Sequence, residues 1–188
     1  IYTQTRRNRD STLGHLFTDI VKEGTGVDIV MISSGAIRGE RLGEVVTKGD
    51  LRKVFPYDNK VVEYKLTGKQ FRDALLWMFR DESIDAPDDG GEFYQLSRGV
   101  KVVYNQKEHR IETLELNGRA VGDDDLIKIA MGDFHYNNID NFLHLDKEDI
   151  KKNGPVKTLS SSDYIIIEER MSGVPLIRVD KEERIVIK

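Results

Sequence analysis

The first half of the chain changes from a helical to a strand-like spacing of apolar residues. Between Leu13 and Val21, apolar residues recur at three- and four-residue intervals, which predicts an amphipathic helix. Asp10 and Ser11 are both good N-cap residues for this helix, and Gly24 is a candidate stop. Residues 27–32 then form a short, β-branched apolar run, which indicates a buried strand.

The same alternation continues in the middle of the chain. We expect Asp50 to cap a short helix at residues 51–55, which Pro56 terminates. Residues 61–66 are typical of a strand, and Thr67 opens a second amphipathic helix. The apolar face of that helix consists of Phe71, Ala74, Leu75, Met78 and Phe79.

Short strands dominate the second half of the chain. Residues 82–92 are rich in Asp, Gly and Glu and are expected to form a loop. The expected strands are residues 100–104, 111–116 (followed by an Asn117-Gly118 turn) and 126–131, with further short runs at 164–168 and up to Ile187. Helices and strands mix without regular βαβ alternation, so we expect an α+β fold with mixed sheets and flanking helices.

Composition limits the classes of protein to which the chain can belong. Its 188 residues, 38% hydrophobic and 33% charged, suit one folded domain spanning 1–188. No apolar run approaches the roughly 20 residues of a membrane span, and a net charge of -4 argues against binding nucleic acid. Cysteine is absent, which excludes disulfides and thiolate zinc sites. Because it begins at Ile1 without a leader, we expect a processed product or a fragment.

Three segments carry side chains suited to an anionic, planar ligand. Residues 6–9 contain three arginines just before a predicted helix N-terminus, where anions bind readily. Arg38 follows the small-residue turn at 33–36, and Tyr57 lies in the turn 56–59 with a ring that could stack on a base. Each feature also has a plainer interpretation, as solvated arginines or as an aromatic packed on its own turn.

Residues 132–142 form a further polar and aromatic segment after a strand. Asp133 and His135 lie close together there, but two side chains do not make a metal site. The chain also lacks the P-loop, zinc-protease, nucleophile-elbow and dinucleotide-binding motifs. We therefore predict no catalytic residue and no metal ligand in this chain.

Five segments, in chain order, match the pattern of one family. They are residues 7–14, 27–38 ("aDiaiiNgGgiR" in the family), 49–51 with 55–59 ("PF-x-N"), 66–70 ("lTGkql") and 133–142 ("nFlanGGDGF"). Together they resemble the C-terminal domain of the 5'-nucleotidase family, which includes bacterial UDP-sugar hydrolases and animal ecto-5'-nucleotidases. The resemblance covers essentially the whole chain and implies the layered architecture of that domain.

The resemblance implies a role in recognition rather than catalysis. In the family, the phosphate faces a dinuclear divalent metal site in an N-terminal metallophosphoesterase domain, while the C-terminal domain binds the nucleoside. That N-terminal domain is absent from this chain, so we expect the isolated chain to be inactive, although it is part of a phosphoric monoester hydrolase. The expected partners are a nucleotide or nucleoside and the N-terminal domain of the same polypeptide. The family further implies a secreted, periplasmic or cell-surface location.

Individual roles follow from the matched positions. Arg7 and Arg38 resemble the arginines that face the phosphate, and Tyr57 and Phe134 resemble the aromatics that enclose the base. Asp140 resembles the acidic residue that contacts the ribose hydroxyls. Two further expected contacts are Ser33, where the family usually has Asn, and Asn59, the Asn of the "PF-x-N" turn.

The segment around Asp140 departs from the family pattern. Asn138 and Ile139 replace the paired glycines before it, and Asn141 replaces the glycine after it. These changes favour one alternative, a stand-alone ligand-binding or surface module. The C-terminal half also does not separate action of the intact protein on 2',3'-cyclic nucleotides, 3'-nucleotides or nucleotide sugars, so these alternatives stay open.

Overall fold

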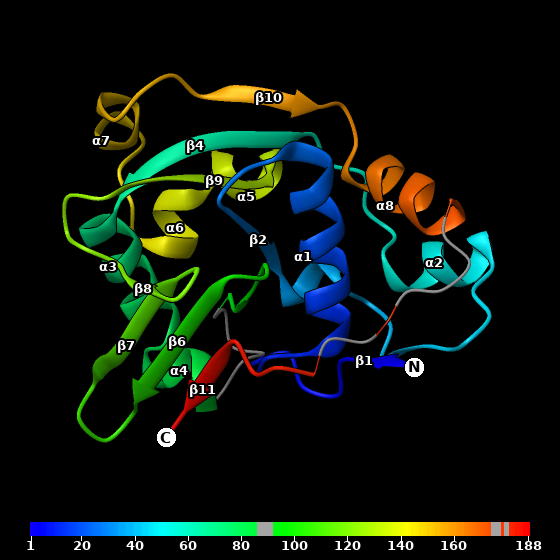
Figure 1. The fold of residues 1–188 in the computed structure, drawn as a ribbon, viewed down its shortest axis with the longest axis horizontal. Coiled ribbons are helices and arrows are strands. Elements are labelled where there is room, and N and C mark those ends of the chain that lie inside the picture. Colours follow the sequence, from blue (N-terminus) through cyan, green and yellow to red (C-terminus); the bar gives the residue numbers. More distant parts are fainter. Residues whose placement is uncertain (86–91, 174–177, 179–180) are drawn as a thin grey trace.

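A mixed central sheet organises the domain. The computed structural model describes residues 1–85, 92–173, 178 and 181–188. In this part the central sheet has the strand order β10 (Lys157–Ser160), β4 (Val61–Thr67), β9 (Leu126–Gly132), β2 (Ile29–Ser33) and β5 (Tyr94–Leu96) (Figure 1). β2 and β9 are parallel, and the other neighbours are antiparallel. The predicted α+β class is confirmed.

A second sheet lies beside the first. Its strand order is β11 (Ile185–Ile187), β6 (Val100–Asn105), β7 (Arg110–Leu116) and β8 (Arg119–Ala120), and a separate pair joins β1 (Tyr2–Thr3) to β3 (Arg41–Leu42). β7 and β8 meet at the predicted turn, where Asn117 and Gly118 have φ values of 53 and 78 degrees. Such positive values at both central residues suit a tight hairpin.

Helices cover both faces of the central sheet. The helices of the described chain are α1 (Thr12–Thr25), η1 (Ser34–Ala36), α2 (Lys48–Val54), α3 (Gly68–Met78), α4 (Asp81–Asp85), α5 (Asp133–Asn137), α6 (Ile139–Leu143), α7 (Lys147–Lys152) and α8 (Asp163–Ser172). In β2, Val30 and Ile32 join a core with α1, α2 and α8, whereas Ile29 and Met31 join a core with α3 and the second sheet. Because both faces are buried, β2 is continuously apolar.

Two predicted helix ends were wrong by a few residues. α1 begins after the N-cap Ser11, as expected, but runs through Gly24 and ends at Thr25, before the C-cap Gly26, whose φ is 73 degrees. Gly24 is a helical residue that faces α8, since an added Cβ would lie 2.8 Å from Ile166 Cγ2. α2 is capped by Thr47 rather than Asp50, which instead completes the capping box from the third helical position.

The run at residues 164–168 is helical, and its prediction as a strand was wrong. The Ser162 hydroxyl caps α8 by accepting a hydrogen bond from Ile165 N at 3.0 Å. Tyr164 and Ile167, three residues apart, are buried in the core that contains α1, whereas Ile165 is 49% exposed. Packing on one helical face therefore outweighs the β propensity of the isoleucines.

The predicted loop at residues 82–92 was partly wrong. Residues 82–85 belong to α4, while residues 86–91 lie outside the described part of the chain. The structure also adds elements that the pattern did not show, namely β1, β3, β5, β8, β10, α5, α6 and α7.

Candidate functional site

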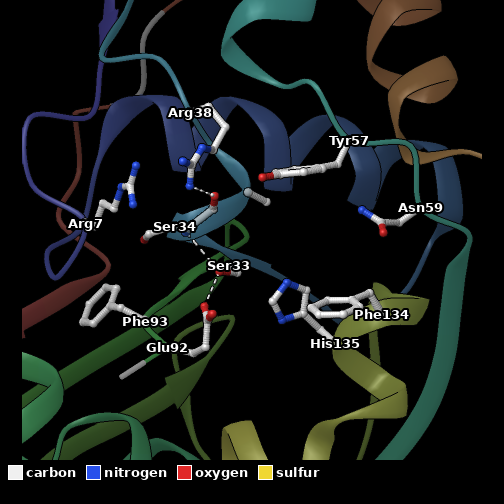
Figure 2. A pocket seen from close by; sticks show the side chains of 12 residues that line it. Arg7, Ser33, Ser34, Arg38, Tyr57, Asn59, Glu92, Phe93, Phe134 and His135 are labelled. Atoms are coloured by element: carbon white, nitrogen blue, oxygen red, sulfur yellow. Dashed lines mark hydrogen bonds between the residues drawn. The ribbon is translucent and has the colours of Figure 1, made fainter. Parts of the chain in front are cut away.

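A pocket of about 470 Å³ opens where β2 ends and the chain turns through η1 (Figure 2). Segments that are far apart in the sequence contribute to its walls. The lining residues are Arg7, Ser33, Ser34, Gly35, Ala36, Arg38, Tyr57, Asn59, Glu92, Phe93, Phe134 and His135. All the predicted ligand contacts except Asp140 are therefore brought together.

The floor of the pocket is the end of β2 and the η1 turn. Ser33 Oγ accepts a hydrogen bond from Gly35 N at 3.0 Å and donates one to the carboxylate of Glu92. The turn is tight, because a Cβ at Gly35 would lie 3.2 Å from Ser33 Oγ. Arg38 N donates to Val54 O at 2.7 Å, which fixes the backbone while the arginine side chain stays exposed.

A buried glutamine holds the floor against the N-terminal segment. Gln95, which is fully buried, donates hydrogen bonds to Ser34 Oγ at 2.7 Å and to Arg9 O at 2.8 Å. Its Oε1 atom accepts from Ser11 N at 3.0 Å. The segment that carries Arg7 is thus tied to η1, since a buried amide group is costly to leave unpaired.

Tyr57 forms one wall and is 47% exposed. Its turn is held by Asp163, whose carboxylate accepts from Asn59 N at 2.9 Å and whose own N–H donates to Asn59 O at 2.8 Å. Burial raises the pKa of Asp163 to about 6, although these hydrogen bonds act in the opposite direction. The helix start of α8 therefore positions the aromatic wall.

Phe134 forms the opposite wall and is 57% exposed, with His135 beside it (Figure 2). Tyr94 Oη lies 2.9 Å from His135 Nδ1. Burial raises the pKa of Tyr94 and lowers that of His135 to about 4, so both groups are neutral at physiological pH. The phenol has no other acceptor among the described residues, so it donates to Nδ1. A neutral imidazole carries one N–H proton, and because Nδ1 accepts the phenol hydrogen bond, this proton is on Nε2.

The charged groups occupy distinct parts of the pocket. Figure 2 shows Arg7 and Arg38 on one side, the two aromatic walls on the other, and Glu92 near Ser33 between them. Burial raises the pKa of Glu92, while the Ser33 hydrogen bond and the charge of Arg7 act to lower it.

Asp140 lies outside the pocket lining. It is exposed in the first turn of α6, and the segment that the family keeps rich in glycine folds here into α5 and α6. Conversely, Glu92 and Phe93 line the pocket but were not among the predicted contacts. Glu92 stood at the edge of a predicted loop, and no local pattern distinguishes it from a solvated carboxylate.

No group of three or more His, Asp or Glu residues in the described part of the chain is placed to hold a metal ion. The resemblance places a dinuclear metal site in the N-terminal domain, and the residues described here do not form such a site themselves. Within the same part of the chain, no helix is long and apolar enough to cross a membrane.

Comparison with known families decides the relationship. The family model described as "5'-nucleotidase, C-terminal domain" matches residues 1–147. The chain belongs to this family. Among curated proteins, it is 26% identical over 140 residues to the trifunctional nucleotide phosphoesterase protein YfkN of Bacillus subtilis, a match that covers 68% of this chain and 9% of that protein.

Solved structures share the fold. A 5'-nucleotidase precursor from Thermus thermophilus superposes with a TM-score of 0.80 at 21% identity, over 100% of this chain and 38% of that one. An NAD nucleotidase from Haemophilus influenzae superposes with a TM-score of 0.75 at 14% identity, over 94% of this chain and 33% of that one. The domain thus spans well under half the length of these relatives.

Proposed function

We propose that this domain recognises the substrate of a nucleotide-hydrolysing enzyme, with the base between Tyr57 and Phe134 and the phosphate near Arg7 and Arg38. The observation that carries the proposal is the single pocket that collects these four side chains from separate parts of the chain. A binding role as such is consistent with the family.

The exposure of the two aromatic rings supports this role. Tyr57 and Phe134 are 47% and 57% exposed, whereas the other phenylalanines of the described chain are buried or half-buried. A large exposed ring costs solvation free energy unless a ligand covers it, and stacking on a base contributes roughly 1–3 kcal/mol. Asn59, next to Tyr57, adds an amide that can bond to polar atoms of a base or sugar.

The two arginines suit the anionic end of the ligand. Both side chains are exposed, and within the described chain the Arg38 guanidinium donates only a long hydrogen bond of 3.4 Å, to Gly35 O. Their guanidinium groups can therefore turn toward a phosphate, which they bind in a fork-like geometry.

Hydrolysis itself would belong to another part of the enzyme. We propose that a separate N-terminal metallophosphoesterase domain of the same polypeptide holds a dinuclear divalent metal site and cleaves the phosphate ester. The chain described here would then bind nucleotide without releasing phosphate. A secreted, periplasmic or cell-surface location is proposed on the family relationship; one structural relative is named as a precursor.

Calorimetric titration of the 188-residue chain with AMP and adenosine tests the proposal. We expect weak binding, a large loss in R38A and Y57A, and near-native binding in Y57F, which keeps the ring. R41A, an exposed arginine on β3 outside the pocket, is the matched control for R38A. Phosphate release by the pure chain with Mn²⁺ or Zn²⁺, or full binding in both R38A and Y57A, would contradict the assignment.

A further inference from the structure

Glu92 is a carboxylate inside a pocket that otherwise suits an anion. It lies next to Ser33 at the floor, between the arginine side and the aromatic side (Figure 2). Its oxygens Oε2 and Oε1 come within 3.7 and 4.0 Å of the Cβ position at Gly35. The carboxylate is therefore held against the turn of the floor rather than extended into solvent.

Ser33 positions this carboxylate. Its hydroxyl donates its single proton to Glu92 Oε2 and accepts from Gly35 N at 3.0 Å. A serine hydroxyl has one proton to donate, so Ser33 has none left for a ligand. Among the described residues, none donates a hydrogen bond to the other carboxylate oxygen, Oε1. The Ser33–Glu92 pair therefore offers a ligand a hydrogen-bond acceptor, not a donor.

We propose that Glu92 accepts hydrogen bonds from the vicinal 2'- and 3'-hydroxyls of a ribonucleoside, the role that the family resemblance would give to Asp140. The proposal rests on the proposed function, because the base between the aromatic walls and the phosphate beside the arginines place the sugar over the floor. Asp140 lies outside the pocket lining, so Glu92 is the acidic side chain that the described lining supplies.

The same position selects against certain phosphates. A 2',3'-cyclic phosphate would bring a negative charge to the floor and would also remove both hydroxyl donors. This phosphate and the Glu92 carboxylate would repel each other, and the repulsion is stronger where water is partly excluded. A 5'-phosphate instead extends toward Arg7 and Arg38. The substrate class that fits the pocket is therefore a 5'-phosphorylated ribonucleoside with free vicinal hydroxyls.

The test compares adenosine with 2',3'-dideoxyadenosine, and AMP with 2',3'-cyclic AMP, by titration of the 188-residue chain. In the unmodified chain we expect adenosine to bind about tenfold tighter than the dideoxynucleoside, since a carboxylate strengthens its hydrogen bonds. The ratio should fall to about threefold in E92Q, which keeps the shape, and to about one in E92A. In D140N it should stay at about tenfold. AMP should bind more tightly than the cyclic nucleotide in the unmodified chain, and this preference should shrink in E92A to the part that the 5'-phosphate gains from Arg7 and Arg38.

Thermal unfolding shows whether each variant is folded. If the Glu92 variants fail to fold, the comparison of the unmodified chain with D140N still decides. Equal binding of the two nucleosides by the unmodified chain, or a ratio lost in D140N, overturns the role of Glu92. An unchanged ratio in folded E92A overturns it as well. If adenosine binds and Y57A weakens it, the proposed function stands even when the Glu92 role fails. Absence of any binding of adenosine or AMP refutes both.

Discussion

Replacing His135 by asparagine removes a histidine that is harder to protonate in the folded chain than in the unfolded chain. The half-buried imidazole contacts Phe134, Phe142 and Tyr94, and desolvation lowers its pKa from 6.5 to about 4. Asn Oδ1 can take the place of Nδ1 as the acceptor of the Tyr94 hydroxyl, so H135N keeps the hydrogen bond while losing the titration.

The direction of the effect follows from proton binding. The unfolded chain, with a histidine pKa of 6.5, takes up a proton that the folded chain refuses until about pH 4. Lowering the pH through this window therefore favours unfolding. Between about pH 7.5 and about pH 5, this histidine should lower the free energy of unfolding by about 2 kcal/mol.

Asp163 acts in the opposite direction. Burial raises its pKa from 3.8 to about 6, so the folded chain takes up that proton first and gains about 1.4 kcal/mol over the same pH range. The two effects largely cancel in the unmodified chain. Only a comparison with H135N isolates the histidine, and D163N isolates the carboxylate.

Denaturant unfolding at the two pH values measures the difference. We expect the unmodified chain to lose about 2 kcal/mol relative to H135N on acidification. NMR titration should also place the His135 pKa well below the ordinary histidine value of 6.5. A stability difference between the unmodified chain and H135N that does not change with pH would show that the fold does not lower the pKa of His135.

Three stability changes follow from other contacts. G14A should cost about 1–3 kcal/mol, because the new Cβ would lie 2.3 Å from Gln95 Oε1; an unchanged melting temperature would exclude this close approach. S11A should cost about 1 kcal/mol through loss of the α1 cap, which accepts from Gly14 N at 2.9 Å, whereas S11T should cost much less. D19N should cost about 3 kcal/mol, because it removes the negative charge that lies 2.7 Å from Nη2 of the buried Arg184; a loss below about 0.5 kcal/mol would count against that ion pair.

Much of the fold could be predicted from short-range patterns in the sequence. The apolar run that became β2 and the capped helix that begins after Thr67 were predicted, because burial on both faces and a capping box both leave short-range patterns. The run at 164–168 was predicted as a strand because three consecutive isoleucines favour one. In the structure it is part of α8, because one face of that helix packs against α1. β5 is only Tyr94–Leu96, too short for periodicity to reveal.

The candidate site shows the same division. Arg7, Arg38, Tyr57 and Phe134 were predicted because ordered family motifs contain them, and the structure places all four on one pocket. Asp140 belonged to the same motif as Phe134, yet the segment around it folds into short helices that leave Asp140 outside the lining. Family position alone could not show this, since the glycines that permit the family's loop are replaced here.

The sequence by itself determined the helices and strands with strong periodicity, the family, and the side chains of arginine and aromatic character that a nucleotide requires. Only the tertiary structure decided that Glu92 meets Ser33 across 59 positions of the chain, and that Gln95 ties the pocket floor to the N-terminal segment. Such contacts leave no periodic trace, because they depend on how the sheet brings β2 and β5 side by side.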